Sequence, residues 1–149
     1  MIDENEKIDF LINIGADKKQ HGEGGFNLLH HLIGTRNIIR DRGGAEYLQD
    51  AGLFHSVYCT QAFHYQSSTN REKVISIIGE RSERLVYLYS ICPRPRVENI
   101  HTLEDGQTKE DLLIMDKANE EEQLPTARMF QKYFDENNSH KCKVEWMGK

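Results

Sequence analysis

The hydrophobic residues recur at helical spacing along most of the chain, and no sustained strand-like alternation precedes the last few residues. Ile8, Leu11 and Ile12 indicate a first amphipathic helix that ends near Gly15. A polar, glycine-rich segment over 17–25 then predicts a loop. The pattern therefore predicts an all-α protein, a compact single-domain bundle of about six to seven helices.

The next predicted helix, over 28–42, begins after Asn27, a favoured N-cap residue, and ends before two glycines. His31 falls on its apolar face, whereas His30 is rotated about 100° away from that face. Thr35 lies one turn beyond His31 on the same face. We therefore expect His31 to point into the interior of the bundle.

A second histidine is expected inside because the helix predicted over 45–58 places His55 on its apolar stripe. Two small residues, Ala51 and Gly52, precede His55 by about one turn and allow a neighbouring helix to approach closely. A single inward histidine is often a core residue bonded to a carbonyl. Two inward histidines on consecutive helices are also compatible with a shared binding site.

The rest of the chain predicts further helices separated by polar or proline-containing breaks. Pro93 and Pro95 end the helical pattern that follows the second histidine, and a polar loop runs from there through Gly106. The predicted elements are one long helix or two shorter ones meeting near Gly79 over 71–92, a helix over 108–123, a C-terminal helix over 125–138 and an irregular tail over 139–149.

Composition supports one soluble domain spanning 1–149 with a core over about 21–124. The chain has 149 residues, of which 38% are hydrophobic and 29% charged. A net charge of −5 provides no general attraction to nucleic acid or to an anionic membrane. Three cysteines without CxxC spacing fit reduced thiols, and we expect a cytoplasmic protein with no membrane span.

Polar residues on the helix over 108–123 are the third candidate for site chemistry. Asp116, Asn119 and Glu122 follow one another along a single drifting stripe. Buried acids need a cation or hydrogen-bond donors opposite them, and two inward histidines with a metal would supply these. The stripe is also compatible with a solvated face, because this helix is charged all round.

Three short motifs together resemble the HD-domain superfamily of helical metal-dependent phosphohydrolases. They are His31-Leu-Ile-Gly-Thr35, Ala51-Gly-Leu-Phe-His-Ser56 and Ala118-Asn119, and they extend over about residues 21–124. The resemblance implies that His31 and His55, 24 residues apart, are metal ligands. In that superfamily an Asp follows the second His and a later Asp completes the site, whereas this chain has Ser56 and Asn119.

The neutral replacements weaken the expected metal site, and other residues could restore it. Asp116 could supply a carboxylate to His31 and His55, which would give a two-His, one-carboxylate site suited to iron or zinc, with manganese as a further candidate. Glu122 is the alternative acid, and His21 could swing in from its loop as a third imidazole or remain exposed. His55, Asp116 and Glu122 are the candidate catalytic residues.

Three functions fit these residues. The first is a metal-dependent hydrolase of a small phosphorylated or nucleotide-like substrate, whose metal lowers the pKa of bound water. The second is a non-catalytic protein that binds a small molecule or takes part in an interaction, and the third is a non-haem iron oxidase or oxygenase. The substrate or ligand would be held by neutral groups, namely Thr35, Ser56, Tyr58, Thr60 and Asn119. The oligomeric state is left open.

Overall fold

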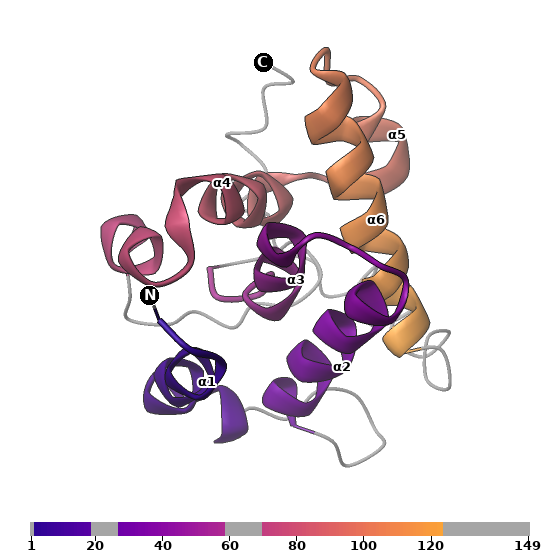
Figure 1. The fold of residues 1–149 in the computed structure, drawn as a ribbon. Helices are drawn as coiled ribbons and strands as arrows, with labels where there is room; N and C mark the ends of the chain where they lie inside the picture. The colour runs from indigo at the N-terminus through magenta and orange to yellow at the C-terminus, as the bar shows by residue number, and fades with distance from the viewer. Residues whose placement is uncertain (1, 19–26, 59–69, 124–149) are drawn as a thin grey trace.

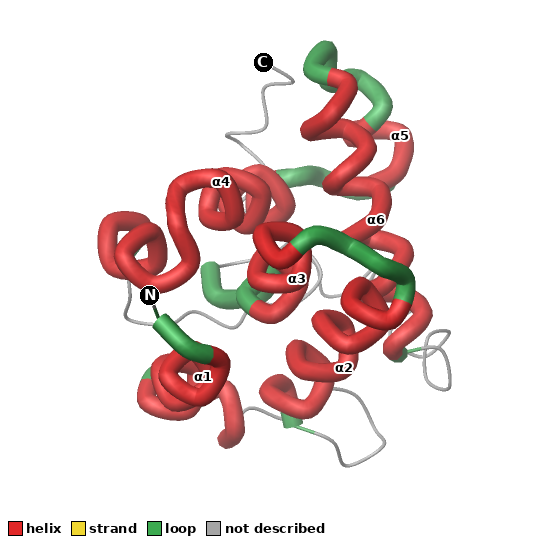
Figure 2. Tube along the Cα trace, viewed as in Figure 1, coloured by secondary structure: helices red, strands yellow, loops and turns green. Residues whose placement is uncertain are grey.

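The computed structural model describes residues 2–18, 27–58 and 70–123, and these residues form helices and turns without a β-strand (Figure 2). The all-α prediction is therefore confirmed. In chain order the elements are α1 (Glu4–Asn13), the short 3-10 helix η1 (Ala16–Lys18), α2 (Leu28–Asp41), α3 (Glu46–Leu53), α4 (Arg71–Ile91), α5 (Arg96–Ile100) and α6 (Gly106–Glu122).

Helix α3 lies at the centre of the fold and packs against α2, α4 and α6 (Figure 1). The close approach of α2 depends on Gly52, because a Cβ at this position would lie 2.6 Å from Ile39 Cδ1. Burial of the apolar faces of these four helices forms one continuous core.

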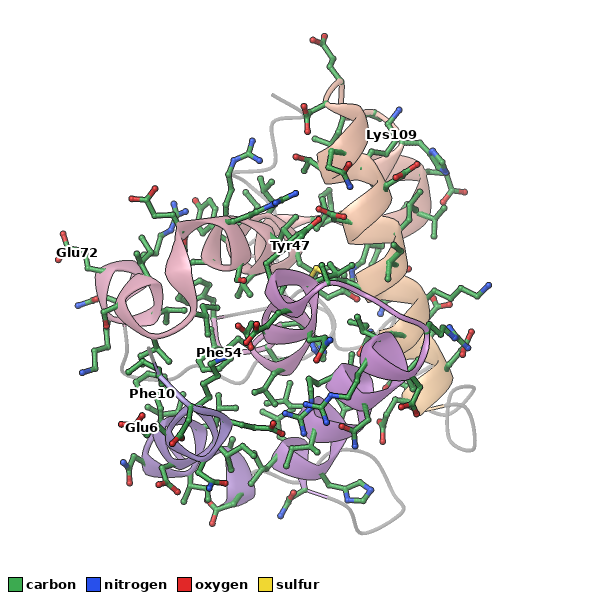
Figure 3. All side chains as sticks on the ribbon, in the orientation of Figure 1. Glu6, Phe10, Tyr47, Phe54, Glu72 and Lys109 are labelled. Carbon is green, nitrogen blue, oxygen red and sulfur yellow. The ribbon has the colours of Figure 1, made fainter. Side chains whose placement is uncertain are left out.

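Helix α1 covers the end of this core. Its N-terminus has a capping box in which Asp3 and Glu6 each accept from the other's backbone N–H. Phe10 stacks on Phe54, with ring centroids 5.9 Å apart, and the two rings face each other between α1 and α3 (Figure 3). Ile12, predicted on the apolar face, is 36% exposed.

Helix α2 begins at the predicted cap, since the Asn27 side chain accepts from the backbone N–H of His30. The predicted helix over 45–58 is wrong in its second half, because α3 ends at Leu53. A turn follows in which Val57 N–H donates to Phe54 O at 2.9 Å. His55 therefore enters the core from a turn and not from a helical face.

Two further predictions concern segments next to breakers, and of the alternatives for 71–92 the two shorter helices meeting near Gly79 are confirmed. Residues 71–92 form two helical segments that meet at Gly79, where φ is +88° and ψ is 164°. The loop predicted after Pro95 is wrong in its first part, because α5 forms there and buries Arg96. Pro95 occupies the N-cap of α5, a position at which its missing N–H costs nothing.

Several predictions fall outside the described residues, namely those for the helix over 125–138, the tail over 139–149, His21 and Thr60. Within the described segments, no helix combines the length and the apolar character needed to cross a bilayer.

Candidate functional site

The two predicted histidines meet in the core between α2, the turn after α3, and α6. His31 is 1% exposed and His55 is 3% exposed. Their Nε2 atoms face each other at 3.2 Å, and their rings lie edge to face with centroids 5.0 Å apart. The helical spacing thus identified His31 correctly, and His55 is buried although the helix expected to carry it is shorter.

The Nδ1 atom of each imidazole, on the side of the ring away from the other histidine, has a hydrogen-bond partner that fixes the ring orientation. His55 Nδ1 lies 2.7 Å from Gly52 O, so this nitrogen carries a hydrogen that it donates to the carbonyl. His31 Nδ1 contacts Glu122 Oε1 in the same manner, with a carboxylate as acceptor. Both Nε2 atoms are consequently the ones directed into the site, as in metal-binding histidines whose other nitrogen bonds a carbonyl or carboxylate.

The Glu122 carboxylate reaches His31 across the surface of α2 at Gly34. A Cβ at position 34 would lie 2.7 Å from Glu122 Cγ and 2.8 Å from Glu122 Oε2. The absence of a side chain at Gly34 therefore makes room for Glu122. Glu122 lies on the Nδ1 side of His31 and not between the two histidines, and its role as the alternative acid stays a prediction.

Asn119, on α6, completes the centre. Its Oδ1 lies 2.7 Å from His31 Nε2, and its Nδ2 donates to the hydroxyl of Tyr89 at 3.0 Å. Tyr89 in turn donates its hydroxyl hydrogen to Asp116 Oδ1 at 2.8 Å. Because that hydrogen is used, the Tyr89 oxygen accepts from Asn119, and the amide oxygen of Asn119 faces His31.

Asp116 is separated from the imidazole pair by this network. Its Oδ1 accepts from Tyr89 and, at 3.1 Å, from Arg96 Nη1. Burial tends to lower the pKa of Arg96, but the neighbouring Tyr89 and Asp116 outweigh it and raise that pKa. The predicted set of His31, His55 and Asp116 does not assemble, since Asp116 neutralises a buried guanidinium, and the described residues contain no group of three His, Cys, Asp or Glu suited to a metal.

Two of the other residues predicted to hold a substrate, Thr35 and Tyr58, use their hydroxyl groups in hydrogen bonds within the protein. Thr35 Oγ1 donates to His31 O at 2.9 Å within α2. Tyr58 donates its hydroxyl to Glu83 at 2.7 Å, and burial together with this carboxylate raises the pKa of Tyr58. Ser56 is buried directly after His55. Within the predicted neutral group, Asn119 is the residue whose side chain contacts the imidazole ring of His31.

Three electron-pair donors therefore converge: His31 Nε2, His55 Nε2 and Asn119 Oδ1. With both Nδ1 atoms donating outward, lone pairs at such distances require a shared proton or metal ion. Two nitrogens bound to one ion at about 2.1 Å lie about 3.0 to 3.4 Å apart at angles from about 90° to 110°. The separation of 3.2 Å between the two Nε2 atoms fits this range, so the histidine pair suits a divalent ion. Asn119 Oδ1, 2.7 Å from His31 Nε2, lies closer than this range and would have to move outward to share the ion.

Sequence reasoning missed the roles of Tyr89, Arg96 and Gly34. Tyr89 lies in the segment predicted to be helical over 71–92, but nothing in the spacing indicates a contact with a residue 30 positions later. Arg96 lies in a segment that looks like a polar loop. Gly34 follows the first histidine in an otherwise ordinary helical pattern, where a glycine is the one visible signal of a close approach.

A family model with the description Domain of unknown function (DUF6817) matches residues 10–94, which is more than half of the chain. The match includes both histidines and Tyr89 and ends before Asn119 and Glu122. No curated protein and no solved structure matches the chain.

Proposed function

Since the chain belongs to the family described as Domain of unknown function (DUF6817), we propose its function from the chemistry of its own site. The proposed function is a metal-dependent hydrolase of a small phosphorylated or nucleotide-like substrate, built on an HD-like scaffold. The resemblance of the three motifs to the HD-domain superfamily supports the substrate class, and the geometry of the site supports the metal.

The observation that carries the proposal is the facing pair of imidazoles with both Nδ1 atoms anchored. His31 Nε2 and His55 Nε2 are 3.2 Å apart in a buried location. A buried imidazole needs a partner for its Nδ1 atom in any core, whereas two Nε2 lone pairs that face each other at 3.2 Å need a shared proton or ion between them. This arrangement supports a preformed cation site.

His31, His55 and Asn119 would hold the ion, with Glu122 strengthening His31 as a ligand from behind. A bound divalent ion would acidify a water ligand and so provide a nucleophile near neutral pH. Two imidazoles and one amide oxygen bring no negative charge into direct contact with the ion. This donor set favours zinc or iron over magnesium, which prefers carboxylates and water.

The neutral donor set also favours a second candidate, a non-catalytic protein that binds a small molecule. The Asp116 carboxylate accepts hydrogen bonds from Arg96 and Tyr89, so it is not placed to act as a general base beside the imidazoles. The iron oxygenase alternative needs a carboxylate in that position, and the described residues offer none within such a group. The second candidate is therefore preferred to the oxygenase.

Turnover separates the two candidates. We expect the purified chain, supplied with zinc, iron or manganese, to release phosphate from members of a panel of nucleotides and sugar phosphates. His31→Ala and His55→Ala should each reduce kcat by at least about 100-fold, because each removes an ion ligand. His30→Ala is the matched control, since His30 is the exposed neighbour of His31 on α2.

The result for the control decides how a loss of activity is interpreted. Activity should survive in the His30→Ala variant at the wild-type level. A wild-type chain that binds the ion and hydrolyses no member of the panel would refute the hydrolase and favour the binding protein. Equal activity in the wild type and the His31→Ala variant would refute the proposed site.

A further inference from the structure

We propose that Tyr89 is a positioning residue that turns the amide oxygen of Asn119, and not its amide nitrogen, toward His31 and the metal site. The inference rests on the proposed metal centre, which it deepens. An asparagine can bind a cation through its oxygen alone, because the NH₂ group has no lone pair to offer. The orientation of this one amide therefore decides whether the centre has two ligands or three.

The hydroxyl of Tyr89 has all of its hydrogen-bonding positions occupied. It donates to Asp116 Oδ1 at 2.8 Å and accepts from Arg96 Nη1 and from Asn119 Nδ2, both at 3.0 Å. Tyr89 is 1% exposed, and burial raises its pKa well above the usual value, so the hydroxyl keeps its hydrogen. One donated and two accepted bonds are the full capacity of a hydroxyl group.

The hydroxyl also changes the group that faces Asn119 from a hydrogen-bond donor, Arg96, to a hydrogen-bond acceptor, the Tyr89 oxygen. Arg96 is a donor at every nitrogen, and a guanidinium facing an amide attracts the amide oxygen. With Tyr89 between them, Arg96 and the NH₂ group of Asn119 both donate to the same oxygen. The amide oxygen is then left to face His31 Nε2 at 2.7 Å.

Asp116 and Arg96 hold Tyr89 in this role. Asp116 takes the hydroxyl hydrogen and thereby directs both lone pairs away from itself. Arg96 neutralises Asp116 at 3.1 Å, and its guanidinium also lies over the Tyr89 ring, with Cζ 4.3 Å from the centroid. The buried ion pair thus acts on the metal centre through the hydroxyl of Tyr89.

The Tyr89 ring also contacts the His55 ring, and a variant that probes the hydroxyl alone has to keep this ring contact. The ring meets the His55 ring edge to face, with centroids 5.6 Å apart and an interplanar angle of 88°. Tyr89→Phe keeps this contact and removes the hydroxyl alone. In this variant Arg96 becomes the polar group that faces Asn119, so the amide turns its oxygen toward Arg96 and its NH₂ group toward His31.

The test is a double-mutant cycle of Tyr89→Phe and Asn119→Asp, read as cobalt(II) affinity by calorimetric titration of the full chain. Tyr89→Phe should weaken cobalt binding by about 10- to 100-fold when residue 119 is Asn. It should weaken binding by less than about threefold in the Asn119→Asp background. A carboxylate presents an oxygen in either orientation, so it needs no hydroxyl to turn it.

Equal losses in the two backgrounds would overturn the inference, because they would indicate general damage to the fold. Circular dichroism and thermal unfolding of all four proteins check that each is folded. An unchanged cobalt affinity in the Tyr89→Phe variant with Asn119 present would overturn it as well.

A wild-type chain that binds no cobalt would refute the metal centre, and a metal-free measurement then decides the role of Tyr89. Nuclear Overhauser contacts from the side-chain NH₂ group of Asn119 report which way the amide faces. We expect contacts with the Tyr89 ring in the wild type, and with the His31 ring in the Tyr89→Phe variant. The same contacts in both proteins would overturn the inference.

Discussion

Glu122 and Gly34 form the contact on which the orientation of His31 depends. The carboxylate lies where a side chain at position 34 would be, with Glu122 Cγ 2.7 Å from the position of a Cβ. Glu122 is the last residue of α6, and Gly34 lies in the middle of α2. The approach of these two helices therefore fixes both the position of the acid and the ring that it holds.

Gly34→Ala should weaken metal binding without weakening the fold. The added methyl group pushes Glu122 away from His31 Nδ1, and loss of such an outer contact lowers metal affinity by about 10- to 100-fold. Alanine favours the helix over glycine by about 1 kcal/mol, so the free energy of unfolding should stay level or rise. Titration calorimetry and urea unfolding measure the two effects.

Gly106→Ala is the control, because a Cβ at this position meets nothing within 4 Å. It should leave the metal affinity unchanged. A Gly34→Ala protein with wild-type affinity would show that Glu122 has no part in holding the ion.

Cys92 gives a prediction for alkaline pH. Burial raises the pKa of its thiol to about 12, against 9.0 for an ordinary cysteine. Between these values the unfolded chain loses a proton that the folded chain keeps, so the free energy of unfolding should fall by about 1.4 kcal/mol per pH unit from this group. Urea unfolding at pH 9.5 and 10.5 measures the slope.

Cys92→Ala should remove this contribution and make the slope shallower by about that amount. The comparison concerns the slope and not the absolute stability, which the lost thiol also changes. Identical slopes in the two proteins would mean that the thiol ionises equally well in the folded chain.

At the level of single residues, helical spacing was sufficient to place His31 in the core, whereas it left open whether the stripe with Asn119 is buried or solvated. It could not predict which acid serves the site. Asp116 and Glu122 lie on the same stripe, and the choice between them depends on Arg96, a residue brought in by α5, and on the gap at Gly34. Such pairings join distant parts of the chain and have no periodic signal.

At the level of elements, the break in α4 illustrates how one glycine shapes the packing. Gly79 has φ +88° and ψ 164°, a conformation open to glycine and strained for other residues. The segment after it carries Tyr89 to the site, while the segment before it follows another direction (Figure 1). The kink is therefore part of what positions Tyr89.

Gly79→Ala should lower the free energy of unfolding by about 1 to 3 kcal/mol. The cost is backbone strain alone, because a Cβ at position 79 would meet nothing within 4 Å. Thermal and urea unfolding test this, with Gly106→Ala as the unstrained counterpart. A Gly79→Ala chain as stable as the Gly106→Ala chain would contradict the strain.

Element boundaries were predictable where a local signal marks them. Asn27 marks the start of α2, and Gly43, with φ +82°, follows its end. The end of α3 has no comparable signal, and the chain leaves the helix after Leu53, where Gly52 is a weak helix former. The turn that results gives His55 its bond to Gly52 O, which no helical projection contains.

At the scale of the whole molecule, the site depends on three separate parts of the chain meeting around α3. His31 comes from α2, His55 from the turn after α3, and Asn119 from α6. An ion bound by all three, as proposed, would stabilise the folded chain and not the unfolded one. At a free concentration 100 times Kd, this adds about 2.7 kcal/mol to the free energy of unfolding.

The stoichiometry of bound metal tests the central claim most directly. The untagged chain is dialysed against zinc, and elemental analysis gives the number of ions per chain, with the His30→Ala protein and the His31→Ala/His55→Ala protein treated alike. We predict one ion per chain for the wild type and for His30→Ala, and none for the double variant. A wild-type chain without zinc, or a double variant that retains as much as the wild type, would contradict the account.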